Sequence, residues 1–83
     1  MSQNFPNPFN PTTIIQYSIP NAAEVELTLF DLLGRELKVL VVGKQEAGYY
    51  QVQLNSAGLT PGLYFYRLRA GEYSETRKLL LIH

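Results

Sequence analysis

Apolar and polar residues alternate with a period of two along most of this chain, which is the pattern of half-buried β-strands. Ile15, Tyr17 and Ile19, for example, are separated by single polar residues. The pattern predicts strands over residues 12–19, 24–31, 36–42, 50–54, 64–69 and 74–82. Turn residues separate these segments. Six or seven short strands without a convincing helix indicate an all-β fold, an immunoglobulin/fibronectin-III-like β-sandwich of about seven antiparallel strands.

Two segments depart from simple alternation. Residues 32–42 have leucines at roughly helical spacing, but Val39, Val41 and Val42 favour a strand because β-branched side chains lose rotamer freedom in a helix. The last predicted strand ends in the uninterrupted apolar run Leu79 to Ile82. Such a run is typical of a strand that is covered on both faces or that meets a partner.

Size and composition narrow the classes of function. The 83 residues make one small domain with a thin core and little room for a catalytic cleft. The chain has no cysteine, and its only histidine is His83. No serine lies in a nucleophile-elbow context, and the carboxylates are scattered singly. We therefore expect no enzyme, no cofactor, no metal and no small-molecule substrate.

Charge and hydropathy add two exclusions. Seven basic and seven acidic residues cancel, and no basic stripe is present, so nucleic acid is not an expected partner. The chain has neither a long apolar run nor a signal peptide. An exported domain of this kind would have to travel as part of a larger precursor.

The segment from Asn4 to Pro11 is unusually rich in asparagine and proline. Proline fixes φ and removes a backbone donor, so we expect an extended polyproline II segment that lies against the domain. Two interpretations remain open. The prolines protect an exposed sheet edge from strand addition, or the segment contacts a partner directly.

Four segments carry short motifs in a fixed order. They are Asn-Pro-Phe-Asn-Pro at 7–11, Leu-Phe-Asp-Leu-Leu-Gly-Arg-Glu at 29–36, Gly-Leu-Thr-Pro-Gly-Leu-Tyr-Phe-Tyr-Arg-Leu at 58–68, and Lys78 before aliphatic residues. Together they resemble the type A C-terminal sorting domain of the type IX (Por) secretion system. A related immunoglobulin-like domain of flagellar hook-capping proteins shares the sandwich and the Asn-Pro-Phe opening.

The resemblance implies a non-catalytic C-terminal secretion and sorting signal. Such a domain directs a larger passenger protein from the periplasm across the outer membrane and to cell-surface attachment, or to release. The implied partners are the upstream passenger domain and the outer-membrane secretion and sortase proteins of the type IX system. Residues 4–83 would form the sorting domain, with residues 1–3 a linker remnant or an added start.

The resemblance also maps motif residues onto this chain. They are Pro6, Asn7, Pro8, Asp31, Gly34, Gly62, Tyr64 and Lys78. To these we add the terminal run, which could join a partner sheet by β-augmentation: Leu79, Leu80, Leu81 and Ile82. The resemblance also implies a lysine or arginine close to the C-terminus, whereas this chain ends in Leu81-Ile82-His83, so Arg77 and Lys78 would have to supply that charge.

Other interpretations of these residues stay open. Asp31 and Gly34 are the residues of an ordinary turn, and a metal role for Asp31 would need further oxygen ligands. Tyr64 and Tyr66 share a face with Leu68, which favours core packing over a sugar-binding platform. The competing functions are a retained structural or cell-surface attachment module and a carbohydrate-binding accessory module.

Overall fold

The computed structural model describes residues 5–7, 10–55 and 58–81, with side chains from residue 12 onward within these ranges. Strands are the only regular secondary structure among the described residues. Their bounds are β1 Phe5–Asn7, β2 Asn10–Ile19, β3 Ala23–Phe30, β4 Glu36–Gln45, β5 Gly48–Asn55, β6 Gly62–Ala70 and β7 Tyr73–Leu81. No helix in this part of the chain is long and apolar enough to span a membrane.

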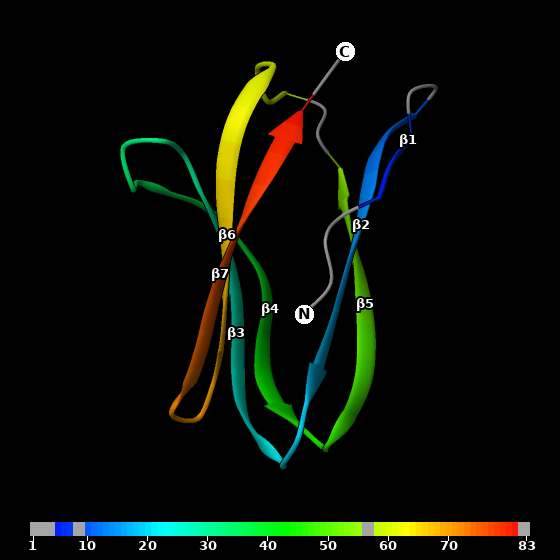
Figure 1. Cartoon of the computed structure of the whole chain (residues 1–83), viewed down its shortest axis with the longest axis vertical. Helices are drawn as coiled ribbons and strands as arrows, with labels where there is room; N and C mark the ends of the chain where they lie inside the picture. The colour runs from blue at the N-terminus through cyan, green and yellow to red at the C-terminus, as the bar shows by residue number, and fades with distance from the viewer. Residues whose placement is uncertain (1–4, 8–9, 56–57, 82–83) are drawn as a thin grey trace.

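The strands form two antiparallel sheets that face each other (Figure 1). One sheet has the order β1-β2-β5 and the other the order β4-β3-β6-β7. In the lettering of immunoglobulin-type sandwiches the two sheets become A-B-E and C′-C-F-G, so that a C′ strand is present where the constant type has a D strand. The all-β sandwich predicted from the sequence is confirmed.

The core lies between the two sheets and is built by alternate residues of β2, β3, β5, β6 and β7, as the period-two pattern predicts. Its buried apolar members are Ile15, Tyr17, Ile19, Val25, Leu27, Leu29, Leu54, Tyr64, Tyr66, Leu68, Ala70, Leu79 and Leu81. The rings of Tyr17 and the half-buried Tyr50 stack with centroids 5.4 Å apart. Core packing of Tyr64 and Tyr66 is therefore confirmed, and Tyr49 is left almost fully exposed on the opposite face of β5.

The structure corrects the conformation expected for the proline-rich segment. Phe5–Asn7 forms the strand β1, and β2 begins at Asn10, so polyproline II is wrong for these residues. Pro6 pairs with Thr13 in the register of β1 and β2, and the register shifts between Pro6 and Asn7. Proline is excluded from central strands but tolerated at a sheet edge, where its missing N–H can face away from the ladder.

The described part of the terminal apolar run, Leu79–Leu81, is not covered on both faces by the fold. β7 is an edge strand that pairs with β6 alone. Leu79 and Leu81 are buried, whereas Leu80 is 54% exposed on the outer face. Leu79–Leu81 therefore alternates like the other strands, and of these three residues Leu80 is left without cover from the fold.

The strand β4 forms the other edge of the same sheet and is distorted. Its register with β3 shifts twice, so that Leu37 and Leu40 have no partner residue on β3. Bulges of this kind hinder edge-to-edge pairing of sheets. The helical alternative for residues 32–42 is excluded, because residues 36–45 form this strand.

A candidate recognition site at one end of the sandwich

The fold brings the motif segments to one end of the sandwich. The β3–β4 hairpin, the start of β6, the end of β7 and the β1–β2 pair all lie toward the upper end in Figure 1. The registers agree with this view: Gly62 pairs with Leu81, Tyr64 with Leu79, and Phe65 with both Phe30 and Lys78. Segments that are far apart in the sequence therefore meet in one region.

The β3–β4 hairpin is closed by a three-residue loop, Leu32 to Gly34. Asp31 N–H donates to Arg35 O at 3.0 Å, and Gly34 N–H donates to Asp31 O at 3.0 Å. This is a turn followed by a glycine bulge, and it leaves the Arg35 N–H without a backbone acceptor. Gly34 has φ +82 and Gly62 has φ +145, so both occupy backbone conformations that favour glycine.

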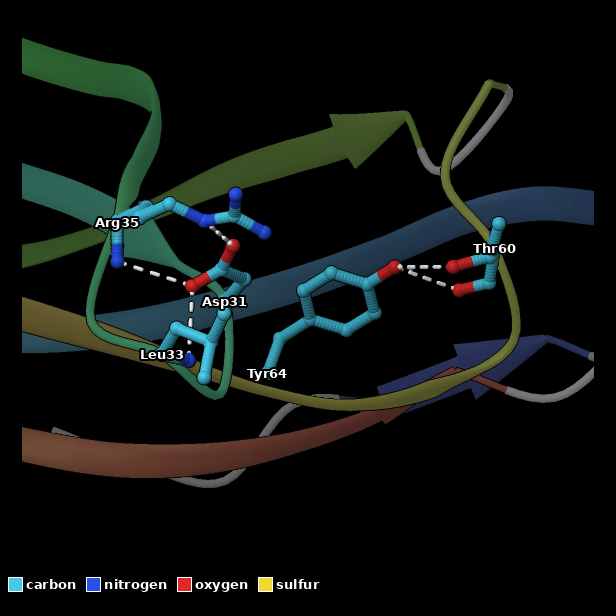
Figure 2. Close-up of polar contacts among 5 residues, drawn as sticks. All are labelled: Asp31, Leu33, Arg35, Thr60 and Tyr64. Carbon is cyan, nitrogen blue, oxygen red and sulfur yellow. Dashed lines mark hydrogen bonds and ion pairs between the residues drawn. The ribbon is translucent and has the colours of Figure 1, made fainter.

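The Asp31 carboxylate completes the hydrogen bonding of this turn (Figure 2). Its Oδ1 accepts the N–H groups of Leu33 and Arg35, each at 2.9 Å. Its Oδ2 accepts Nε of Arg35 at 2.7 Å. The expectation that Asp31 accepts backbone N–H bonds in a turn is confirmed. No group of three or more Asp, Glu, His or Cys side chains suited to a metal occurs among the described residues.

These donors also lower the pKa of Asp31. The largest effect is the hydrogen bond from the backbone N–H of Arg35, which lowers the pKa. Partial burial of the carboxyl raises it. The Arg35 side chain and the Leu33 N–H lower it further. The pKa of the carboxyl is therefore below its usual range in the folded domain. Because the unfolded chain binds the proton more readily, Asp31 stabilises the fold fully above its unfolded pKa, about 3.9, and loses that contribution as pH falls.

A comparison of wild type with Asp31→Asn should reveal this dependence on pH. Asparagine keeps an acceptor oxygen for the two backbone N–H groups but carries no titrating charge. We expect the wild-type free energy of unfolding to fall more steeply than that of the variant between about pH 5 and pH 2. Urea titrations at a series of pH values measure this. A constant difference between the two proteins over that range would contradict it.

Tyr64 fixes the neighbouring loop in a second way. Its buried ring lies in the core, and its hydroxyl donates to Thr60 O at 2.6 Å and lies 3.2 Å from Thr60 Oγ1 (Figure 2). A tyrosine near the start of strand F whose hydroxyl bonds to the backbone a few residues upstream is the tyrosine corner of immunoglobulin-type sandwiches. Tyr64 therefore holds the β5–β6 loop against the end of the core.

Removing the hydroxyl should weaken the domain while leaving the ring in place. We expect Tyr64→Phe to lower the free energy of unfolding by about 0.5–1.5 kcal/mol, since a partly buried hydrogen bond is lost and Thr60 O is left without this donor. Urea denaturation gives the value. Tyr49→Phe is the matched control, because Tyr49 is 93% exposed and its change should stay within about 0.5 kcal/mol. Equal costs would argue against the role of Tyr64.

A shallow pocket of about 220 Å³ lies between the hairpin and the β5–β6 loop. Its lining brings together three of the motif residues, Asp31, Gly62 and Tyr64. A second depression, of about 240 Å³, lies on the outer face of the four-stranded sheet and is lined by Gly34, Phe30 and Arg67 among others. The Arg67 guanidinium carbon lies 4.8 Å from the centroid of the Phe30 ring. The hairpin therefore has a hollow on each side.

The remaining motif residues are less closely grouped. Lys78 and Leu80 face outward from β7, and Leu79 and Leu81 face the core beside Tyr64 and Gly62. Pro6 and Asn7 belong to β1 at the same end of the molecule, with only their backbone described. Pro8 and Ile82 lie outside the described residues. The structure thus assembles Asp31, Gly34, Gly62 and Tyr64 most tightly.

Two residues of this region were not singled out as site residues from the sequence. Arg35 was part of the quoted motif, but its ion pair with Asp31 depends on the bulged turn. Thr60 is likewise part of a quoted motif, and its contact with Tyr64 depends on the path of the β5–β6 loop. The pair Asp31 and Arg35, four residues apart across a glycine, was the one available signal for the first contact.

Comparison with known families agrees with this arrangement. A family model described as a secretion system C-terminal sorting domain matches residues 3–82. The chain therefore belongs to the family of type IX secretion C-terminal sorting domains. No curated protein and no solved structure matches it.

Membership has consequences at the level of the family. The domain is a C-terminal sorting signal for type IX secretion, and signals of this family are in general non-catalytic. A sorting domain of this kind interacts with the type IX machinery, and it accompanies export to the outer membrane, the cell surface or the medium.

Proposed function

We propose that this domain acts as a folded, non-catalytic sorting signal. It directs a passenger protein from the periplasm across the outer membrane and to attachment at the cell surface. The passenger precedes it in the chain. Outer-membrane secretion proteins bind the domain, and a sortase-type protein of the same system then acts on the precursor. No nucleic acid or small-molecule substrate takes part.

The observation that carries the proposal is the meeting of the motif segments at one end of the sandwich. Asp31, Gly62 and Tyr64 line one pocket, and Gly34 lines its neighbour across the hairpin. Asp31 and Gly34 belong to the β3–β4 hairpin, and Gly62 and Tyr64 lie at the start of β6, directly after the β5–β6 loop. A surface formed by loops on a rigid sandwich is a common place for partner recognition.

The end of β7 adjoins this surface and forms its second part. Tyr64 and Gly62 pair with Leu79 and Leu81, and Lys78 and Leu80 are exposed on the outer face of the same strand end. A partner that binds the hairpin can therefore also contact Lys78 and the unpaired backbone edge of β7. We include Pro6 and Asn7 in the surface because β1 lies at the same end of the molecule.

An export assay tests the proposal. The 83-residue chain is fused behind a reporter enzyme that carries its own signal peptide, and the fusion is produced in a bacterium with a type IX secretion system. We expect reporter activity on intact cells or in the medium, and none from a strain that lacks the system. A reporter that remains in the periplasm of the competent strain would refute the proposed function.

A further inference from the structure

We propose that the tip of the β3–β4 hairpin is the anchor of this domain, and that it binds a protein surface with an apolar cavity and a carboxylate at its rim. The anchor consists of Leu32, Leu33 and Arg35. This inference rests on the proposed function, because it specifies the chemistry of the secretion partner that binds this end of the sandwich.

The first argument is the exposure of the two leucines. Leu32 is 60% exposed and Leu33 is 77% exposed, although they occupy the centre of a tight turn. Turn positions of this kind usually carry polar residues or glycine. Leucine side chains in this position add little to the core of the domain. Their burial in a partner would remove adjacent apolar surface from water.

The second argument is the orientation of the Arg35 guanidinium. Its Nε is held by Asp31 Oδ2 at 2.7 Å, and its side chain is 72% exposed. Figure 2 draws a contact with Asp31 from Nε alone and none from the two terminal nitrogens. No further partner of the guanidinium occurs among the described residues. The two terminal nitrogens of a guanidinium held in one plane are suited to a bidentate carboxylate, so charge complementarity indicates an acidic group on the partner.

The third argument is that the anchor is already ordered. Two backbone N–H groups that donate to the Asp31 carboxylate and two hydrogen bonds across the turn fix the backbone at this tip, and the Nε of Arg35 is held by the same carboxylate. A preordered loop avoids part of the entropic cost that binding imposes on flexible segments. The pocket of about 220 Å³ beside the tip, which Leu32, Leu33 and Arg35 help to line, leaves room for a side chain of the partner.

These features favour a protein over a bare anionic surface as the occupant. A phosphate group would satisfy Arg35 but would leave both leucines and the apolar side of the pocket in water. A cavity with a carboxylate at its rim satisfies all three features together. Such a cavity also gives specificity, since the carboxylate would be left unpaired by a domain without the arginine.

The test uses variants in the export fusion described above. Arg35→Glu, Arg35→Gln and Leu33→Asn should each lower the exported fraction by about tenfold or more relative to wild type. Two controls match them in exposure and chemistry. Arg69→Glu reverses an exposed cation on β6, and Val42→Asn replaces a 74% exposed aliphatic residue on β4. Both controls should be exported at the wild-type level.

Folding is controlled separately, because Arg35→Glu places a second carboxylate beside Asp31. Each purified variant is checked for a cooperative thermal transition. Each is also expressed without a passenger in the periplasm of cells that export the wild-type fusion. Free wild-type domain should compete and lower reporter export, whereas folded Leu33→Asn and Arg35→Gln domains should not compete.

The outcomes separate the two claims. A wild-type fusion that is not exported refutes the proposed function itself. If the wild-type fusion is exported and the hairpin variants are exported as well as the two controls, only the proposed role of the hairpin tip as the anchor is overturned. Loss of export in Leu33→Asn but not in either Arg35 variant overturns the claim that the partner carries a carboxylate at the rim of its cavity. A wild-type dimer in sedimentation that Leu33→Asn abolishes would show that a second copy is the occupant, and would also overturn the proposal.

Discussion

Replacing Leu79 by alanine should lower the free energy of unfolding by about 2–5 kcal/mol. Leu79 is fully buried near the end of β7, opposite Tyr64, so the substitution removes apolar contacts and leaves a cavity in a thin core. A domain of this length has a total stability of roughly 4–12 kcal/mol. The single change therefore removes a large part of it. Urea denaturation followed by circular dichroism measures the difference.

Leu80→Ala is the matched control, since the two residues are neighbours of the same type on one strand. Leu80 is 54% exposed on the outer face, so its replacement should change stability by no more than about 0.5 kcal/mol. Similar costs for the two variants would contradict the register of β7. The pair also separates folding from recognition in export assays, because only Leu80→Ala alters the exposed strand end without opening the core.

Five of the strands, β2, β3, β5, β6 and β7, could be predicted because one face of each contributes buried residues to the core. Alternation in residues 12–19 and 64–69 reflects the contact of every second side chain with the opposite sheet, and β2 and β6 contain those segments. β1 was missed because Pro6 argues against a strand when no neighbour is known. Its pairing depends on an edge position next to β2, which is a property of the assembled sheet and not of the local sequence.

The turn of the site could also be predicted, but its surroundings could not. Asp31 and Gly34 are local signals for a capped turn with positive φ, and both behave as expected. The pocket that Asp31 shares with Tyr64 arises because β3 and β6 are neighbours in one sheet, although more than 30 residues separate the two side chains in the sequence. Such neighbours follow from the order of strands in a sandwich, which local patterns do not specify.

The second large effect is expected at Gly34. An ideal Cβ at this position would meet no atom within 4 Å, so space does not restrict the residue, but its φ of +82 does. Gly34→Ala should therefore destabilise the domain by about 1–2 kcal/mol, the cost of a left-handed conformation for an L-residue. For a domain of this size each kcal/mol corresponds to a shift of the thermal midpoint by about 4–8 °C. Differential scanning calorimetry measures that shift.

Asparagine at the same position distinguishes backbone strain from crowding by an added side chain. Asn has a side chain larger than that of alanine but enters the left-handed region more readily, because its amide can bond to the local backbone. Gly34→Asn should therefore cost less than Gly34→Ala. If the cost instead rises with side-chain size, crowding and not φ governs the position. The glycine would then be needed for the depression between Phe30 and Arg67, and not for the turn that orients Asp31 and Arg35.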